Sequence, residues 1–276
     1  MKNLVSIEWL KNNMDKENLV IFDARYVLGD ESYGKAEYEK GHIPNAVFVP
    51  VEELLTGEIE EHGGRHPLPH MEEFVHNMNK LGVDSKSTVV VYDDGDLSMA
   101  GRLWWMLRYI GHGEVYVLSG GYKDWKSKDY PISTNAPEIR KADELSINLQ
   151  KNMIADINDA KKAILAEDQV LVDSRTADRY RGEIEPIDKI AGHIPGAVNL
   201  PWTDLSIYDS DTDITEIKKH FKFVEDYNKI IVHCGSGITG TVNILFMEEA
   251  GLSAELYVGG YSDWISYPEN EVVTEI

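Results

Sequence analysis

The feature that most constrains the fold of this chain is an internal duplication. Four segments recur in the same order in both halves, and their spacing is almost constant: Asp23 and Asp173 are 150 residues apart, and His42 and His193 are 151 apart. The matched segments are LVIFDAR (19–25) with VLVDSR (170–175), GHIPNAVFVP (41–50) with GHIPGAVNLP (192–201), TVVVYDDG (88–95) with KIIVHCG (229–235), and VYVLSGGYKDW (115–125) with LYVGGYSDW (256–264). A repeat of this length indicates two domains of one fold rather than a solenoid of short repeats.

Each half alternates short apolar segments, rich in β-branched residues, with segments of helical periodicity. This order predicts parallel strands joined by helices that cover both faces of a sheet. Ser6 is a candidate helix N-cap, and Gly82 follows a helical segment as a stop signal. We therefore predict an α/β chain of two tandem, doubly wound domains at 1–135 and 145–276. The polar, proline-containing residues 136–144 are the expected linker.

Composition excludes several classes of protein. The formal net charge of −21 argues against binding to nucleic acid or to an anionic membrane, both of which attract basic surfaces. The apolar runs are strand-sized, and the N-terminus lacks a secretory apolar region, so we expect a cytoplasmic protein that acts as a monomer. The single cysteine excludes an internal disulfide and any multi-thiolate metal site. No metal or organic cofactor is expected.

That cysteine, Cys234, occupies a position suited to chemistry. It follows the predicted strand KIIVH (229–233) and opens the glycine-rich loop CGSGITG (234–240), which leads into a helix. In parallel α/β folds, ligands bind beyond the carboxyl ends of the strands. Glycines allow several backbone amides to converge on one anion, and the helix N-terminus adds partial positive charge. A lone cysteine is more often buried packing, but this loop favours a thiolate nucleophile.

Three chemistries use a loop of this kind, and the sequence separates them. GSGITG (235–240) matches the dinucleotide pattern G-x-G-x-x-G, but only 36 residues follow it, too few for the rest of such a fold. A cysteine-dependent phosphatase needs an arginine after five intervening residues, where this chain has Gly240. Sulfur transfer needs one thiolate, converging amides and a nearby cation, and it remains the best match.

The repeated D-A/S-R, G-H-I-P-x-A and G-G-Y-x-D-W segments resemble the tandem-domain rhodanese and 3-mercaptopyruvate sulfurtransferase family. The resemblance covers nearly the whole chain. It implies that the C-terminal copy carries the nucleophile and that the N-terminal copy is catalytically silent. The sequence agrees, because Asp93 stands in the first copy where Cys234 stands in the second.

The resemblance also implies the remaining site residues. It implies a proton relay of Ser236, His66 and an acid near Glu52, and a substrate-binding role for Arg179. The residues expected at the site are thus Cys234, Ser236 and His66 for catalysis, and Arg179, Gly235, Gly237, Ile238, Thr239 and Glu52 for binding. His66 belongs to a segment present only in the first copy, which is long enough to reach the other domain's site: the GHIP histidine and the loop position are 51 residues apart there and 41 apart in the second copy.

The donor stays open between two anions. The loop CGSGIT resembles the 3-mercaptopyruvate branch, but a second substrate arginine of that branch falls near Ile187 in this chain. The implied reaction moves a sulfane sulfur from thiosulfate or 3-mercaptopyruvate, through a Cys234 persulfide, to cyanide, a small thiol or a thioredoxin-like protein. The alternative is a non-enzymatic module of the same fold that senses sulfide or redox state or binds protein.

Some conspicuous residues are predicted to be structural because they recur in both copies. Arg25 and Arg175 follow Asp23 and Asp173 by two positions and are expected to form ion pairs at the strand ends. His42 and His193 are expected to stabilise turns.

Overall fold

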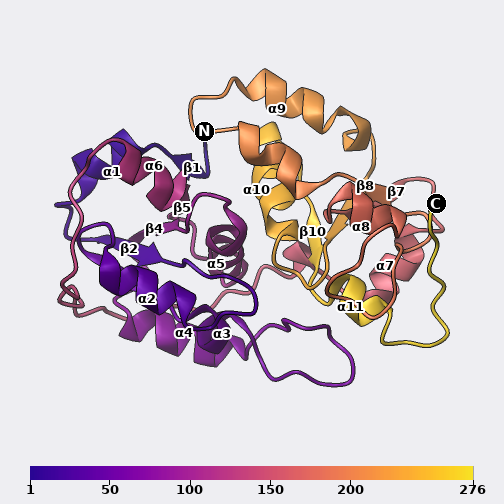
Figure 1. The fold of residues 1–276 in the computed structure, drawn as a ribbon, viewed down its shortest axis with the longest axis horizontal. Helices are drawn as coiled ribbons and strands as arrows, with labels where there is room; N and C mark the ends of the chain where they lie inside the picture. The colour runs from indigo at the N-terminus through magenta and orange to yellow at the C-terminus, as the bar shows by residue number, and fades with distance from the viewer. Residues whose placement is uncertain (276) are drawn as a thin grey trace. The chain divides into compact units, whose positions relative to one another are not determined.

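The structure is a computed structural model that describes residues 1–275, and it contains two five-stranded sheets (Figure 1). Every pairing between named strands is parallel. The chain divides into two compact units. The first consists of Met1–Gly57, Leu68–Gln150 and Asp209–Asp211, and the second of Glu58–Pro67, Lys151–Tyr208 and Thr212–Ile276. The two sheets with their helices confirm the predicted tandem α/β fold.

The sheet of the first unit has the strand order β1-β5-β4-β2-β3. Its strands are β1 (Leu4–Val5), β2 (Leu19–Asp23), β3 (Ala46–Phe48), β4 (Thr88–Tyr92) and β5 (Val115–Leu118). Its helices are α1 (Ile7–Asn13), α2 (Tyr33–Lys40), α3 (Val51–Leu55), α4 (Met71–Lys80), α5 (Ser98–Tyr109) and α6 (Gly121–Ser127).

Side-chain alternation along the central strands fills both faces of this sheet. Ile21 and Val90 point to the face that packs against Leu10 of α1 and Trp125 of α6. Their neighbours in sequence point to the other face, where α5 lies against β4 and β5. Both faces are therefore buried, which explains the nearly continuous apolar strands of the sequence.

The second unit repeats this arrangement with the order β6-β10-β9-β7-β8. Its strands are β6 (Ile154–Ala155), β7 (Gln169–Asp173), β8 (Val198–Asn199), β9 (Lys229–His233) and β10 (Glu255–Tyr257). Its helices are α7 (Ile157–Ala163), α8 (Ala177–Arg181), α9 (Ile214–His220), α10 (Gly240–Ala250) and α11 (Gly260–Trp264), with the 3-10 helices η1 (Lys151–Met153), η2 (Trp202–Ile207) and η3 (Lys222–Val224). The central strand β9 lies between β7 and β10 and leads directly to the candidate loop.

Local sequence signals begin and end several helices, at Ser6 and Gly82 as predicted. Ser6 caps α1, and its hydroxyl accepts a hydrogen bond of 3.1 Å from the amide of Trp9. Gly82 follows α4 with a φ of +97°, and Gly251 follows α10 with a φ of +86°. No helix within residues 1–275 is long and apolar enough to cross a membrane.

The expected linker residues pack against the first unit. The guanidinium of Arg140 donates hydrogen bonds to the Gly82 carbonyl and to Ser87, and it binds the carboxylate of Asp84 at 2.8 Å. These contacts hold the Asp84 pKa at about 2: burial opposes ionisation, but bonds from the Lys86 amide and from Arg140 outweigh it. The division at 136–144 stays a prediction.

Both expected ion pairs are present, and each ties a strand end to the following GHIP turn. Arg25 binds Asp23 at 2.7 Å and donates to the Gly41 carbonyl at 2.8 Å. Arg175 binds Asp173 at 2.6 Å and donates to the Gly192 carbonyl at 2.8 Å. All four charged side chains are at most 1% exposed. The pairs therefore fix the crossover from β2 and β7 to the next strand.

The two histidines of the repeat make matching structural contacts. His42 Nδ1 lies 2.8 Å from the Tyr38 carbonyl, and His193 Nδ1 lies 2.8 Å from the Tyr180 carbonyl. Each ring also stacks on the tyrosine ring, with centroids less than 4 Å apart. Equal contacts in both copies confirm that these histidines stabilise turns.

We predict that Asp23→Asn lowers the free energy of unfolding by about 3–5 kcal/mol, because it leaves the buried charge of Arg25 without a counterion. The measurement is a urea titration followed by tryptophan fluorescence. The control is Lys40→Ala, which removes an exposed ion pair with Glu37 and should cost at most about 1 kcal/mol. Equal effects of the two substitutions would contradict a special role for the buried pair.

Candidate active site

Cys234 follows β9 directly, and its loop is held by hydrogen bonds to its carbonyl groups. The amides of Tyr261 and Ser262, in the first turn of α11, donate to the carbonyls of Cys234 and Gly235 at 2.8 and 2.9 Å. A trans peptide places its C=O and N–H on opposite sides. The amides of Gly235 and Ser236 therefore point away from α11.

Those amides are available for a ligand. Within residues 1–275, the backbone amides of Gly235, Ser236, Ile238 and Thr239 donate to no protein acceptor. Gly235 and Ser236 are buried, and the Cys234 side chain is only 2% exposed. Buried amides nearly always have a partner, so a bound anion or ordered water is expected to fill this concavity.

The corresponding loop of the first unit shows how such amides are satisfied. There the carboxylate of Asp93 accepts hydrogen bonds from the amides of Gly95, Leu97 and Ala100, at 2.9, 3.1 and 3.1 Å. The Asp93 carbonyl accepts from Tyr122, as that of Cys234 accepts from Tyr261. Burial and the charge of Asp96 raise the pKa of Asp93 to about 7, whereas the three amide bonds favour its charged form. The loop of the first unit thus surrounds the chain's own carboxyl group, and the loop of the second unit begins at a thiol.

Glycine is required where the loop passes Val258, the residue that follows β10. Gly237 has a φ of +76°, and a Cβ there would lie 2.4 Å from the Val258 carbonyl oxygen. A side chain would therefore strain the backbone and collide with main-chain atoms that cannot move aside.

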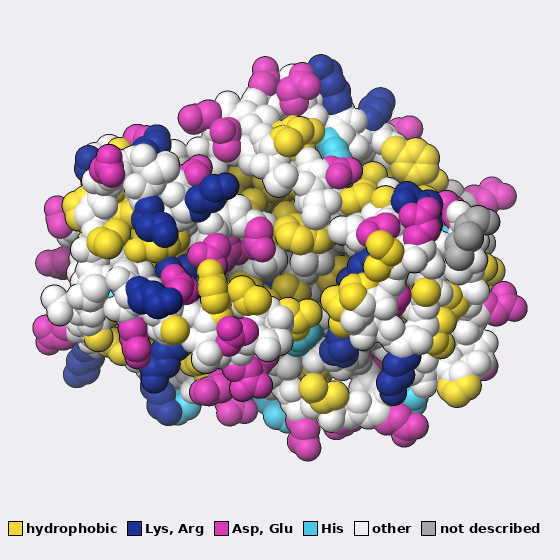
Figure 2. All heavy atoms as spheres, in the orientation of Figure 1, with side chains coloured by type: hydrophobic (Ala, Val, Ile, Leu, Met, Phe, Trp, Pro, Cys, Tyr) yellow, Lys and Arg dark blue, Asp and Glu magenta, His cyan; other side chains and the backbone are white. Residues whose placement is uncertain are grey.

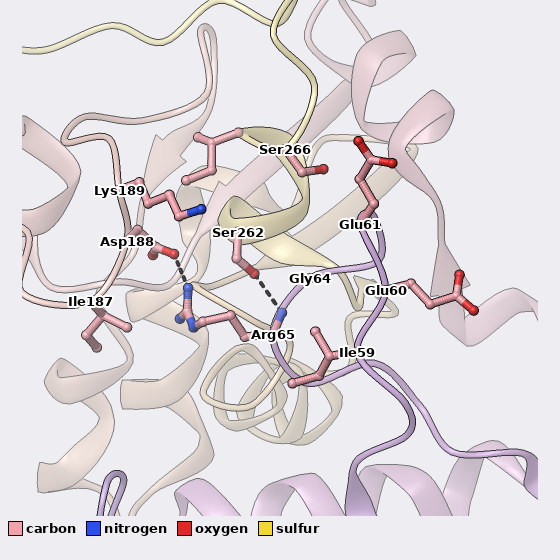
Figure 3. A pocket seen from close by; sticks show the side chains of 11 residues that line it. Ile59, Glu60, Glu61, Gly64, Arg65, Ile187, Asp188, Lys189, Ser262 and Ser266 are labelled. Atoms are coloured by element: carbon pink, nitrogen blue, oxygen red, sulfur yellow. Dashed lines mark hydrogen bonds and ion pairs between the residues drawn. The ribbon is translucent and has the colours of Figure 1, made fainter.

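The extra segment of the first half packs within the second unit, against α11. The amide of Gly63 donates to Asp263 at 2.7 Å, and the amide of Arg65 donates to the Ser262 hydroxyl at 3.1 Å (Figure 3). These contacts place His66 Nδ1 2.6 Å from the Ser236 hydroxyl. Two of the predicted site residues, 170 positions apart in sequence, therefore form a hydrogen bond in the loop that follows Cys234.

Arg179, the predicted binding residue, lies in a cluster of charges. Its guanidinium binds Glu185 at 2.8 Å and Asp188 at 2.9 Å, and its side chain is 15% exposed. Burial opposes ionisation of Glu185, but bonds from Arg179 and from two amides outweigh it and keep its pKa below the ordinary value. Arg179 is thus held in place by two carboxylates.

Three residues of this cluster, Arg65, Glu185 and Asp188, were not singled out by the sequence. Arg65 binds Asp188 from the other side. A methyl group on Gly235 would lie 3.0 Å from Nη2 of Arg65 and 3.6 Å from Nη2 of Arg179. The sequence analysis singled out His66 in the extra segment. The signal that could have indicated Arg65 is its position directly before His66.

Thr239, Glu52 and His233, which the sequence analysis also considered, lie on different elements. Thr239 is the N-cap of α10, without a side-chain capping bond. Glu52 lies on α3 of the first unit, where its carboxylate accepts a hydrogen bond from the Tyr26 hydroxyl. Its membership of the site stays a prediction. His233 is fully buried and faces Asp173, with Nε2 3.8 Å from the carboxylate, which agrees with the expectation that it is not the base.

A pocket of about 240 Å³ adjoins the cluster (Figure 3). Its lining includes Arg65, Asp188, Lys189 and Ser262, and the side chains of Glu60 and Glu61 extend along its rim. Acidic side chains are also widely distributed over the surface seen in Figure 2. An anion that approaches this site therefore depends on local arginines to offset the acidic surroundings.

Comparisons with known proteins agree with this geometry. A family model described as a rhodanese-like domain matches twice, at residues 6–128 and 156–267. The chain is 35% identical over 272 residues to a 3-mercaptopyruvate sulfurtransferase of Escherichia coli, covering 94% of both chains. It is 33% identical over 260 residues to a putative thiosulfate sulfurtransferase of Mycobacterium tuberculosis, covering 91% of this chain and 89% of the relative.

A solved structure gives the same result. The crystal structure of a 3-mercaptopyruvate sulfurtransferase from Escherichia coli, described as having the rhodanese fold, superimposes with a TM-score of 0.82 at 33% identity. It covers 95% of this chain and 100% of that chain. The repeated fold and its single-cysteine loop define an enzyme that transfers sulfur. The chain belongs to the rhodanese family, among its tandem-domain sulfurtransferases.

We predict that Gly237→Ala destabilises the protein more than Gly251→Ala. Both positions have a positive φ, which costs about 1–2 kcal/mol for alanine, but only Gly237 lacks room for the methyl group. The collision should add about 1–3 kcal/mol. Chemical denaturation of both variants measures the difference, and equal losses would show that the close approach to Val258 is not a constraint.

Proposed function

We propose that this sulfurtransferase takes a sulfane sulfur from a small anionic donor and holds it as a persulfide on Cys234. The observation that carries the proposal is the loop after Cys234. Within residues 1–275 its Gly235, Ser236, Ile238 and Thr239 amides donate to no protein acceptor, and the matching loop of the first unit surrounds a carboxyl group. The terminal sulfur of a persulfide anion would accept those hydrogen bonds. The amides of Gly235, Ser236, Ile238 and Thr239 thus stabilise the charged intermediate.

The proposed sulfur transfer conserves atoms and electrons with either of the donors that appear in the relatives' names, thiosulfate and 3-mercaptopyruvate. With thiosulfate, the Cys234 thiolate attacks the outer sulfur, an S–S bond forms, and the donor's own S–S bond breaks to release sulfite. With 3-mercaptopyruvate, the C–S bond breaks, its electron pair goes to carbon, and that carbon takes a proton to give pyruvate. Cyanide or a thiolate then attacks the outer sulfur of the persulfide and regenerates the Cys234 thiolate.

The pair formed by His66 and Ser236 moves the proton that 3-mercaptopyruvate requires. The donor's thiol loses a proton, and the departing carbon must gain one. A hydroxyl bonded to an imidazole can accept and return a proton at neutral pH. Thiosulfate carries no such proton, so this pair matters more for 3-mercaptopyruvate.

Arg179 binds the anionic end of the donor, since its guanidinium lies beside the loop that carries the nucleophile. In this scheme the first domain is catalytically silent, because Asp93 occupies the position of the nucleophile. The acceptor, whether a small thiol or a thioredoxin-like protein, the cytoplasmic location and the monomeric state stay predictions.

We predict that treatment with thiosulfate or 3-mercaptopyruvate adds one sulfur atom to Cys234. Mass spectrometry of the intact protein and of the peptide that contains Cys234 measures the addition, and cyanide should reverse it. Cys234→Ser should lower turnover by at least about a thousandfold, because the nucleophile is removed. A wild-type protein that transfers sulfur from neither donor would favour the non-enzymatic module instead.

We predict that His66→Ala and Ser236→Ala each lower kcat with 3-mercaptopyruvate by roughly a hundredfold or more. The double variant should lose little more than either single variant, because the two groups act as a pair. Steady-state kinetics with both donors measures the loss, and the exposed histidine of α4 supplies the control His76→Ala. Unchanged kinetics in a folded His66→Ala protein would remove His66 from the site.

A further inference from the structure

His233, the residue before the nucleophile, is a buried histidine that the proposed reaction does not use. Its Nδ1 lies 3.1 Å from the carbonyl oxygen of Cys234. A carbonyl oxygen only accepts hydrogen bonds, so this ring nitrogen carries a proton and donates it. The Cys234 carbonyl therefore has two donors, the imidazole of His233 and the amide of Tyr261 at 2.8 Å.

The other ring nitrogen of His233 is left as an acceptor. Burial lowers the pKa of His233, against the raising effect of Asp173, and Arg175 and His193 act in the same direction as burial. The ring is thus neutral at pH 7, with an unprotonated Nε2. Within residues 1–275, this Nε2 has no hydrogen-bond partner, and it lies 3.8 Å from Oδ2 of Asp173. Two buried acceptors therefore face each other and need a donor between them.

The first unit shows what joins these positions. Tyr92 is the strand partner of Asp23, as His233 is the strand partner of Asp173. The Tyr92 hydroxyl donates to Oδ2 of Asp23 at 2.7 Å and accepts from the amide of Ile43 at 3.2 Å. One oxygen atom thus connects the carboxylate at the strand end with the GHIP turn.

The shorter imidazole of the second unit does not reach as far as the phenol. Ile194, the counterpart of Ile43, is fully buried, and within the described residues 1–275 its amide donates to no protein acceptor. One water molecule satisfies all three groups, because it accepts from the Ile194 amide and donates to Asp173 and to Nε2 of His233. Three polar partners are typical of a buried water. Its oxygen takes the place of the tyrosine hydroxyl oxygen in the first unit.

The neighbouring strand is adapted to this exchange. Tyr257 of β10 stands where Leu118 stands in β5. The ring centroids of Tyr257 and His233 are 6.4 Å apart, and Tyr92 and Leu118 belong to the matching core of the first unit. Each unit therefore combines a larger and a smaller side chain at these two positions, and the copy with the thiol is the one with the histidine.

We propose that His233 is a positioning residue for the nucleophile loop. Its Nδ1–H fixes the Cys234 carbonyl, and a buried water molecule holds the other side of the ring against Asp173 and the Ile194 amide. The inference rests on the proposed function. Because the Gly235 amide belongs to the same peptide group as the Cys234 carbonyl, fixing the carbonyl also fixes the direction of that amide.

The first unit lends support to this role, because its loop carries no nucleophile. There Tyr92 directs its hydroxyl to Asp23, whereas the carbonyl of Asp93 accepts from the amide of Tyr122 at 2.8 Å. The donor from the strand end to the loop carbonyl is thus a feature of the unit that contains Cys234.

Two variants separate positioning from folding. The double variant His233→Tyr with Tyr257→Leu rebuilds the pair of the first unit, so a hydroxyl reaches Asp173 and Ile194 but no ring donor faces the Cys234 carbonyl. We expect a urea midpoint close to that of the wild type and a kcat about tenfold lower with both donors, at similar KM. The reference is Tyr257→Leu alone, which accounts for the lost bond from the Tyr257 hydroxyl to Asp263.

The second variant is the reverse. In His233→Asn the side-chain NH₂ takes the place of Nδ1 and keeps a donor at the Cys234 carbonyl, while the rest of the ring is lost. The protein should unfold at a lower urea concentration, yet kcat should stay within about threefold of the wild type. A purely structural histidine would instead give losses of kcat that follow the losses of stability in both variants.

The tautomer and the water are measured directly on the wild-type protein. Nitrogen NMR of the histidine-labelled chain at pH 7 should show a proton on Nδ1 of His233 and none on Nε2, with His233→Asn used for assignment. A crystal structure should show one water within hydrogen-bond distance of Nε2, of Oδ2 of Asp173 and of the Ile194 amide.

Three results would overturn the inference. A proton on Nε2 instead of Nδ1 would remove the bond to the Cys234 carbonyl. A crystal structure without that water would refute the link to Asp173. Unchanged kcat in a folded double variant would show that the bond does not position the loop; if that variant does not fold, a tenfold or greater fall of kcat in a folded His233→Asn protein would contradict the inference equally.

Failure of the proposed function would look different. The wild type would then transfer sulfur from neither donor, while the tautomer and the water could still be observed. Alkylation of the Cys234 thiol by iodoacetamide at pH 7 needs no sulfur donor, and it should be about tenfold slower in the double variant than in Tyr257→Leu.

Discussion

The candidate site depends on two hydrogen bonds that α11 donates to the loop after β9. By binding the carbonyls of Cys234 and Gly235, the amides of Tyr261 and Ser262 fix the direction of the two peptide groups that follow the nucleophile. The geometry of the peptide bond then turns the opposite amides toward one concavity. A helix of five residues thus organises the loop through its first turn. The same helix also anchors the extra segment through Ser262 and Asp263.

The duplication offers an internal comparison of what such a loop binds. Both copies share the hydrogen bond from the helix after the last strand, yet one loop begins with a carboxylate and the other with a thiol. In the first unit three loop amides donate to the carboxyl group of Asp93 and favour its charged form, against the burial that raises its pKa to about 7. In the second unit the carboxylate of Asp188 binds both Arg65 and Arg179.

The fold could be predicted from the sequence, because it rests on local patterns that occur twice. The apolar strand segments, the terminal glycines and the Asp-x-Arg pairs each act over a few residues, and the structure contains them all. Of the expected site residues, His66 and Ser236 form a hydrogen bond, and the role of each stays a prediction. The position of Arg65 could not be derived in this way. It meets Asp188 across 123 residues, and no periodicity or spacing encodes such a contact. Nor did the sequence indicate how deeply Cys234 is buried, since burial depends on how the extra segment and α11 pack around it.

The assignment of residues 58–67 to the second compact unit has a consequence for how the chain can be divided. A fragment made of the C-terminal half alone would keep the thiol but lose His66, which binds Ser236, and Arg65, which binds Asp188. The second compact unit therefore draws residues from both halves of the sequence, and a cut between the two copies would divide that unit's own set of contacts.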